Sequence, residues 1–194
     1  MEILKLYDVL KKSDTRKKVL AGIRSGRIFV YPTDTIYGTG CNAEDAKAVE
    51  RIRLAKGREE TKMFSVIAPG KEWIRKHAKV GKVNMGLIDK LLPGPYTLIL
   101  DANTKSPKPV ISPEKSLGVR IPRHPFTDIV MEAGVPFVTT SVNLRGEPPV
   151  TKISDIPGSM KGFVDIAIDS GTIEGNPSRI FDLRANDVHV ITRR

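Results

Sequence analysis

The stretch from Tyr31 to Lys62 constrains the fold of this chain more than any other part of the sequence. An apolar run stops there at Pro32, which cannot donate a hydrogen bond to a sheet ladder, so the run is typical of a strand that ends. A loop of hydroxyls and glycines follows, then a helical pattern, then three cations at Lys56, Arg58 and Lys62. This succession predicts an α/β protein with a site for a phosphorylated, anionic ligand. A plain solvated helix end stays an open alternative, because cations are favoured there too.

The loop after this strand carries polar groups that suit a ligand site. Residues 33–35 offer two hydroxyls and a carboxylate where the strand ends, which is where ligands bind in open α/β sheets. Gly38 and Gly40 are expected in the loop, where they let the backbone turn and approach a ligand closely. Asn42 is expected to cap the following helix and Gly57 to end it.

The rest of the chain alternates short apolar runs with helical patterns. Strands are expected at residues 28–31, 64–68, 96–100, 118–122, 137–143, 165–169, 179–183 and 188–191, the last two as a hairpin. Helices are expected at residues 14–24, 71–92 and 125–134, with interruptions near Gly81 and Gly86. Residues 102–117 are predicted to form a long surface loop, a candidate lid. The pattern predicts one α/β domain over residues 1–194, with a twisted sheet of mixed parallel and antiparallel strands and flanking helices.

Composition predicts a cytoplasmic protein. The 194 residues are 40% hydrophobic and 28% charged, as in a globular protein with one substantial core. No apolar run reaches the length of a membrane span, and the first residues lack a signal-peptide cleavage pattern. The single cysteine, Cys41, excludes an intrachain disulfide and fits a reducing compartment.

The net charge of +10 predicts attraction to polyanions such as nucleotides or RNA. The basic residues are dispersed along the chain, and aromatic residues make up only 6% of it. A row of aromatic stacking platforms for single-stranded nucleic acid is therefore not expected. Charge alone does not choose among the polyanions.

Several catalytic motifs are absent from the sequence. It has no G-x-x-x-x-G-K-[ST] loop and no G-x-S-x-G elbow. His77, His124 and His189 lack the spacing of metal ligands, so no metal site is predicted. Any ATP must then be held without a Walker loop, and catalysis must rest on positioning and charge neutralisation.

Five segments together resemble one family. They are Pro32-Thr33-Asp34-Thr35-Ile36-Tyr37-Gly38, Lys56-Gly57-Arg58, Leu92-Pro93-Gly94-Pro95-Tyr96-Thr97, Val119-Arg120-Ile121-Pro122 and Ser141-Val142-Asn143. Their order and spacing, over about Ile28 to Arg193, are similar to those of the YrdC/TsaC family of threonylcarbamoyl-adenylate synthases. The resemblance implies a twisted α/β fold with a large basic cavity. At Ile67 many members have a histidine, so one implied threonine contact is missing here.

The resemblance also implies a reaction and its site. L-threonine, bicarbonate and ATP, the last carrying Mg²⁺, would give threonylcarbamoyl-AMP and pyrophosphate for the modification of tRNA adenosine 37. A downstream tRNA threonylcarbamoyl-transfer machinery would use the product. The nucleotide-binding residues would be Arg58, Lys62, Ser116, Asn143, Thr151 and Arg193. The threonine-binding residues would be Thr35, Arg120, Ser141 and Ser178.

The chemistry of these side chains agrees with such a reaction. The guanidinium of Arg120 can clamp a carboxylate with two hydrogen bonds, while hydroxyls can read the other polar groups. Lys56, Arg58 and Lys62 are the expected catalytic cations, since phosphoryl chemistry needs charge neutralised on the phosphates.

Two other functions remain open at this point. One is a double-stranded RNA- or tRNA-binding module that uses the same basic cavity without making an adenylate. The other is carbamoyl transfer through carbamoyl-AMP, as in a related domain of hydrogenase-maturation proteins, whose acylphosphatase-like segment and zinc-finger cysteines are missing here.

Overall fold

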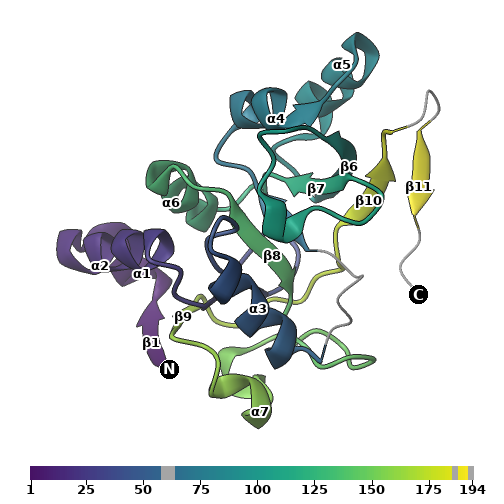
Figure 1. The fold of residues 1–194 in the computed structure, drawn as a ribbon. Coiled ribbons are helices and arrows are strands. Elements are labelled where there is room, and N and C mark those ends of the chain that lie inside the picture. The colour runs from purple at the N-terminus through teal and green to yellow at the C-terminus, as the bar shows by residue number, and fades with distance from the viewer. Residues whose placement is uncertain (58–63, 185–187, 192–194) are drawn as a thin grey trace.

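A computed structural model describes residues 1–57, 64–184 and 188–191 (Figure 1). Three residues with expected roles, Arg58, Lys62 and Arg193, lie outside this part of the chain. The helices are α1 (Leu6–Lys11), α2 (Ser13–Arg24), α3 (Ala46–Ala55), α4 (Lys71–His77), α5 (Lys82–Leu91), α6 (Pro125–Ala133) and α7 (Gly158–Lys161), with short 3-10 turns η1 (Lys108–Val110) and η2 (Ile153–Asp155). The strands are β1 (Glu2–Lys5), β2 (Phe29–Tyr31), β3 (Gly38–Gly40), β4 (Ser65–Ile67), β5 (Ala78–Lys79), β6 (Tyr96–Ala102), β7 (Ser116–Arg120), β8 (Phe137–Ser141), β9 (Ile166–Asp169), β10 (Arg179–Asp182) and β11 (His189–Ile191).

The strands form one mixed sheet, which confirms the predicted fold class. Their order is β1-β9-β2-β3-β8-β4-β7-β6-β10-β11, with β5 paired to β6. The pairs β1/β9, β2/β9, β4/β7 and β6/β10 are parallel, whereas β2/β3, β3/β8, β4/β8, β6/β7 and β10/β11 are antiparallel. The expected terminal hairpin is therefore present as β10 and β11. Strands that are far apart in the sequence are therefore neighbours in one sheet, and the residues at their ends lie close together.

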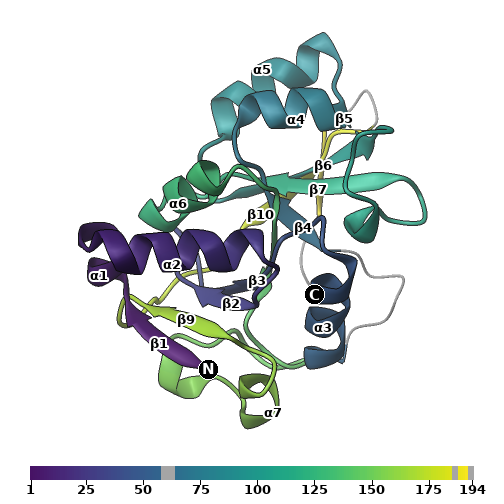
Figure 2. The same cartoon turned by 60° about the vertical axis from the view of Figure 1, so that its left-hand side comes forward.

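Side chains alternate along the central strands and divide the core in two. Phe29 and Tyr31 of β2 face a cluster with α1, α2 and α6, whereas Val30 between them faces a larger cluster with α3, α4 and α5. The same division separates Phe137 from Val138 in β8. Helices therefore cover both faces of the sheet, as Figures 1 and 2 show. Among the described residues, every helix is too short or too polar to cross a lipid bilayer.

Two expectations for the segment between β2 and α3 are wrong. Gly38 and Gly40 belong to strand β3, not to a loop, because β3 pairs with β2 on one side and β8 on the other. A Cβ on Gly40 would lie 1.8 Å from the carbonyl oxygen of Val138, so only glycine allows this close approach of the two strands. The cap of α3 is Asp45, whose carboxylate accepts the N–H of Ala48, and not Asn42.

Other boundaries also differ from expectation. The first residues form β1 and α1, which the sequence pattern did not predict. The interruption between α4 and α5 is strand β5, while Gly86 lies inside α5 without breaking it. The segment 102–117 is not a plain surface loop, because Val110 is fully buried in the larger core. The single-domain organisation over residues 1–194 stays a prediction.

Candidate active site

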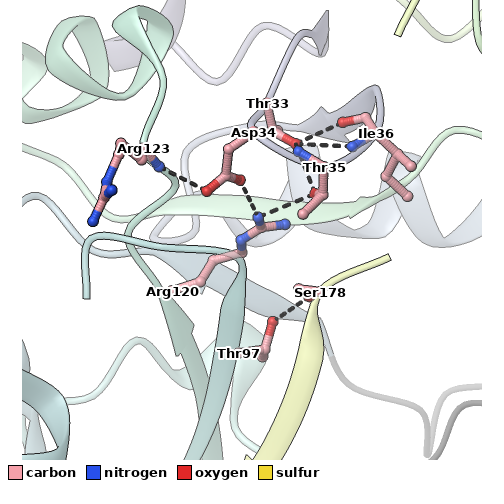
Figure 3. A network of polar contacts seen from close by, with 8 residues as sticks. All are labelled: Thr33, Asp34, Thr35, Ile36, Thr97, Arg120, Arg123 and Ser178. Atoms are coloured by element: carbon pink, nitrogen blue, oxygen red, sulfur yellow. Dashed lines mark hydrogen bonds and ion pairs between the residues drawn. The ribbon is translucent and has the colours of Figure 1, made fainter. Parts of the chain in front are cut away.

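The loop between β2 and β3 is organised by the hydroxyl of Thr33. Its Oγ1 accepts hydrogen bonds from the N–H groups of Thr35 at 3.1 Å and Ile36 at 3.2 Å, and it donates to the carbonyl oxygen of Ile36 at 2.7 Å. The Oγ1 atoms of Thr33 and Thr35 lie 2.9 Å apart. Threonine favours such turns because its side chain replaces a backbone partner. The loop therefore presents Asp34 and Thr35 in a fixed orientation (Figure 3).

Arg120 ends strand β7 and points toward this loop (Figure 3). Its Nη2 donates to Oδ1 of Asp34 at 2.9 Å and to Oγ1 of Thr35 at 3.3 Å. The residue is only 6% exposed, and burial lowers the pKa of its guanidinium while the carboxylate of Asp34 acts in the opposite direction. Its Nε is buried and has no hydrogen-bond partner in the structure. A charged donor left open in this way marks a place for an acceptor from a ligand.

A small polar pocket of about 30 Å³ lies beside this guanidinium. Most of its lining side chains carry hydroxyls, and none of them is acidic; the lining residues are Thr33, Ile36, Tyr37, Gly38, Ser65, Thr97, Arg120, Thr139, Thr140, Ser141 and Ser178. The hydroxyl of Thr97 in β6 lies 2.8 Å from the hydroxyl of Ser178, which directly precedes β10. One buried cation among hydroxyls suits a small molecule that has a carboxylate and a hydroxyl group.

The structure brings the four predicted threonine-binding residues together. The small polar pocket, called the hydroxyl pocket below, is lined by Arg120, Ser141 and Ser178. Thr35 adjoins it through its hydrogen bond to Arg120. They come from four separate parts of the chain, so the sheet topology is what assembles them. Ile67, at the position of the missing histidine, is fully buried in the core under α6 and does not line the pocket.

A second, larger pocket of about 410 Å³ contains two of the predicted nucleotide-binding residues. Asn143 and Thr151 line it together with Leu144, Glu147, Pro148, Pro149, Val150, Asp155 and Pro157. Ser116 lines neither pocket, since it lies at the opposite end of β7 from Arg120 and contacts Ser112 at 2.7 Å.

The segment from Ser141 to Asn143 links the two pockets. The hydroxyl of Ser141 donates to Oδ1 of Asn143 at 2.5 Å. Lys56, which caps α3, donates from Nζ to the carbonyl oxygens of Ser141 at 2.6 Å and Asn143 at 3.1 Å, and to Oδ1 of Asn143 at 3.0 Å. Its side chain thus fixes this segment with hydrogen bonds that also occupy its ammonium group. The expected contact of Lys56 with phosphate stays a prediction.

A strap formed by residues 170–178 runs between the two pockets. The hydroxyl of Tyr37 accepts the N–H of Ser170 at 3.0 Å and donates to the carbonyl oxygen of Gly171 at 2.8 Å. Further along, the N–H of Ile173 donates to the carbonyl oxygen of Thr151 at 2.9 Å. Gly175 packs so closely on the backbone of Thr35 that a Cβ there would lie 2.0 Å from its carbonyl oxygen. The strap ends at Ser178 in the hydroxyl pocket.

Sequence reasoning did not assign site roles to Tyr37, Ser65, Thr97 and Thr139. For Ser65 and Thr97 a signal existed, because each of them interrupts an otherwise apolar strand. Such a residue inside a buried strand needs a hydrogen-bond partner or a polar cavity. No local sequence pattern indicated that Tyr37 contacts the strap.

Comparisons with known proteins show similarity over most of the chain. Residues 21–194 match the Sua5/YciO/YrdC family model, which is described as "Telomere recombination". A Methanocaldococcus jannaschii protein with the provisional name threonylcarbamoyl-AMP synthase is 35% identical, over 96% of this chain and 90% of its own. The threonylcarbamoyl-AMP synthase of Xanthomonas campestris pv. campestris (strain B100) is 31% identical, over 87% of this chain and 93% of its own.

Solved structures are similar over most of the chain. P. abyssi Sua5 complexed with L-threonine superimposes with a TM-score of 0.85 and 26% identity, and this chain spans 55% of its length while 97% of this chain is covered. E. coli YciO gives a TM-score of 0.82 with 28% identity, over 90% of this chain and 86% of its own.

Proposed function

The chain belongs to the Sua5/YciO/YrdC family, and we propose that it is an ATP-dependent L-threonylcarbamoyl-adenylate synthase that serves tRNA modification in the cytoplasm. In this reaction the amine of L-threonine and bicarbonate give a carbamate and water. An oxygen of the carbamate then attacks the α-phosphorus of ATP, and pyrophosphate leaves with the electrons of the broken P–O bond. The product is threonylcarbamoyl-AMP, which a downstream tRNA threonylcarbamoyl-transfer machinery would consume.

The hydroxyl pocket would hold threonine. Its carboxylate would take the open Nε–H of Arg120, and the surrounding hydroxyls would read its hydroxyl and amino groups. The amino group must stay free for carbamoylation, so weak, neutral partners such as Ser141 and Ser178 suit it better than an acid would. The complex of P. abyssi Sua5 with L-threonine supports this choice of ligand.

The larger pocket would hold the adenylate. Asn143 and Thr151 would contact it, and Lys56 would keep Asn143 in place. Arg58, Lys62, Ser116 and Arg193 remain proposed nucleotide contacts, with Lys56, Arg58 and Lys62 as the proposed catalytic cations. Mg²⁺ would enter with the nucleotide and neutralise charge on its phosphates.

The buried guanidinium of Arg120, which lines a pocket of hydroxyls and whose Nε has no partner, carries this proposal. The test is pyrophosphate release from ATP, Mg²⁺ and bicarbonate in the presence of one amino acid at a time. We expect release with L-threonine, and Arg120→Ala should reduce kcat/KM by about 10²-fold or more because a charged hydrogen bond is lost. Equal release without an amino acid, or with any amino acid, would reject the synthase.

The net charge of +10 supports a second candidate, a double-stranded RNA- or tRNA-binding module. Filter binding of tRNA over a salt series separates the two functions. Tight binding that Arg58→Ala and Lys62→Ala abolish, together with no threonine-dependent release of pyrophosphate, would favour the module. Weak tRNA binding that neither variant alters would indicate that the cavity binds ATP and threonine and not RNA.

A further inference from the structure

Asp34 forms an ion pair with the arginine of the hydroxyl pocket. Its Oδ1 accepts from Nη2 of Arg120 at 2.9 Å, and its Oδ2 accepts from the backbone N–H of Arg123 at 2.9 Å (Figure 3). The side chains of Arg120 and Asp34 are 7% and 11% exposed, so water screens the pair little. The carboxylate thus ties the loop after β2 to the end of β7 and to the turn that follows it.

These contacts leave one N–H donor of the guanidinium without a partner. Nη2 is engaged by Asp34 and Thr35, whereas Nε is buried without a partner. We propose that Asp34 is a positioning residue that fixes the guanidinium of Arg120, so that its Nε–H faces the place where the carboxylate of the substrate binds. This inference rests on the proposed function and names a residue that helps to hold the carboxylate of its amino acid.

The geometry argues against two other roles for Asp34. A general base needs a free oxygen near the substrate, but both oxygens of Asp34 already accept hydrogen bonds from the chain. A purely structural ion pair would gain nothing from leaving a charged donor buried and unpaired, since such a group is unfavourable in a folded protein. The unpaired Nε–H is what separates a group prepared for a ligand from an ion pair whose donors are all satisfied.

Charge and positioning predict opposite effects of Asp34→Asn. If the pocket attracted the carboxylate by charge alone, removing the negative charge of Asp34 would tighten threonine binding. If Asp34 acts by fixing the guanidinium, the variant weakens binding, because the neutral amide holds Arg120 less firmly and has only one accepting oxygen. The sign of the change therefore decides between them.

The experiment measures L-threonine binding by calorimetry, and KM for threonine and ATP by pyrophosphate release. For Asp34→Asn we expect the Kd and KM for threonine to rise about tenfold to a hundredfold, as for a weakened charged hydrogen bond. The KM for ATP should stay unchanged, because the larger pocket does not include Asp34. Asp128→Asn is the matched control, since it removes an exposed carboxylate from the first turn of α6.

L-threonine amide, which lacks the carboxylate, supplies a second probe. It should bind the wild type and Asp34→Asn equally weakly, whereas a general distortion of the pocket would weaken its binding in the variant. If Asp34→Asn fails to fold, Asp34→Ser replaces it, because a serine hydroxyl can also accept a hydrogen bond.

Three results would overturn the inference. They are unchanged or tighter threonine binding by the variant, an equal rise of both KM values, and weaker binding of the amide by the variant. Failure of the proposed function looks different, since the wild type itself would then neither bind threonine nor release pyrophosphate with it. A wild type that does both, with a variant that binds threonine just as well, rejects the role of Asp34 alone.

Discussion

The ammonium nitrogen of Lys56 lies 3.0 Å from Oδ1 of Asn143, a residue that belongs to a different strand end and lines the larger pocket. The same nitrogen contacts the backbone carbonyl oxygens of Ser141 and Asn143. A single lysine at the end of α3 thus determines how the segment after β8 passes between the two pockets. Lys56 is 8% exposed, so these hydrogen bonds form away from water.

Replacement of Lys56 by methionine should loosen this segment. The variant keeps the apolar stem but leaves partly buried carbonyl groups without their donor, which costs about 1–3 kcal/mol of unfolding free energy. We expect a rise in the KM for ATP as well, because Asn143 loses its orientation. Urea unfolding and pyrophosphate release measure the two effects. Lys47→Met on the exposed face of α3 is the control, and equal stability of the two variants would contradict the prediction.

Replacement of Tyr37 by phenylalanine should release the strap. The ring is fully buried and keeps its packing, but the backbone of Ser170 and Gly171 loses the hydroxyl that accepts and donates hydrogen bonds there. We expect faster amide hydrogen exchange at residues 170–178 and a loss of about 1–2 kcal/mol of unfolding free energy. Tyr7→Phe, at a side chain on the surface of α1, should change neither quantity. Unaltered exchange in the strap would show that Tyr37 does not anchor it.

Replacement of Gly175 by alanine should push the strap away from the loop after β2. The added Cβ would lie 2.0 Å from the carbonyl oxygen of Thr35, a distance that no backbone contact allows. Because Thr35 bonds to Arg120, we expect threonine to bind about tenfold more weakly, equivalent to about 1.4 kcal/mol. Gly158→Ala is the control, since no atom lies within 4 Å of its added Cβ. Identical calorimetric titrations of the two variants would refute the prediction.

Stability should fall in mild acid through His124. Its Nδ1 accepts the N–H of Phe126 at 3.1 Å and so caps α6 with a neutral ring. Burial lowers the pKa of His124, while the nearby carboxylates of Asp34 and Asp128 act in the opposite direction. Because the pKa of His124 in the folded protein lies below its unfolded value of about 6.5, the neutral ring contributes to the free energy of unfolding. This contribution is fully present above the unfolded pKa and is lost as the pH falls through the folded pKa.

Urea unfolding between about pH 7.5 and pH 4.5 tests this dependence, since the linkage extends across the unfolded pKa. His124→Asn should stay within about 1 kcal/mol of the wild type at neutral pH, because asparagine also caps helices. It should lose the part of the acid slope that His124 contributes. The same slope in both proteins would assign the acid sensitivity to other groups.

Local patterns in the sequence determined most of the secondary structure. The alternation of Phe29, Val30 and Tyr31 fixed a strand with two buried faces, and Pro125 and Gly134 bounded α6 as expected. These features are readable because backbone preferences and side-chain periodicity act over a few residues. The resemblance also supplied the four threonine-binding candidates that adjoin one pocket. The large basic cavity stays a prediction, since Arg58, Lys62 and Arg193 lie outside the described residues.

Only the tertiary structure decided how the site is held. Asp34 and Arg120 are separated by 86 residues, and Tyr37 and Gly171 by 134. Their contacts depend on strand order and register, which no short sequence pattern encodes. The strap and Arg120 reach the loop after β2 only because β3 pairs with β8 in the sheet. Local rules place each residue on a strand or turn, and the register of distant strands determines which of them meet.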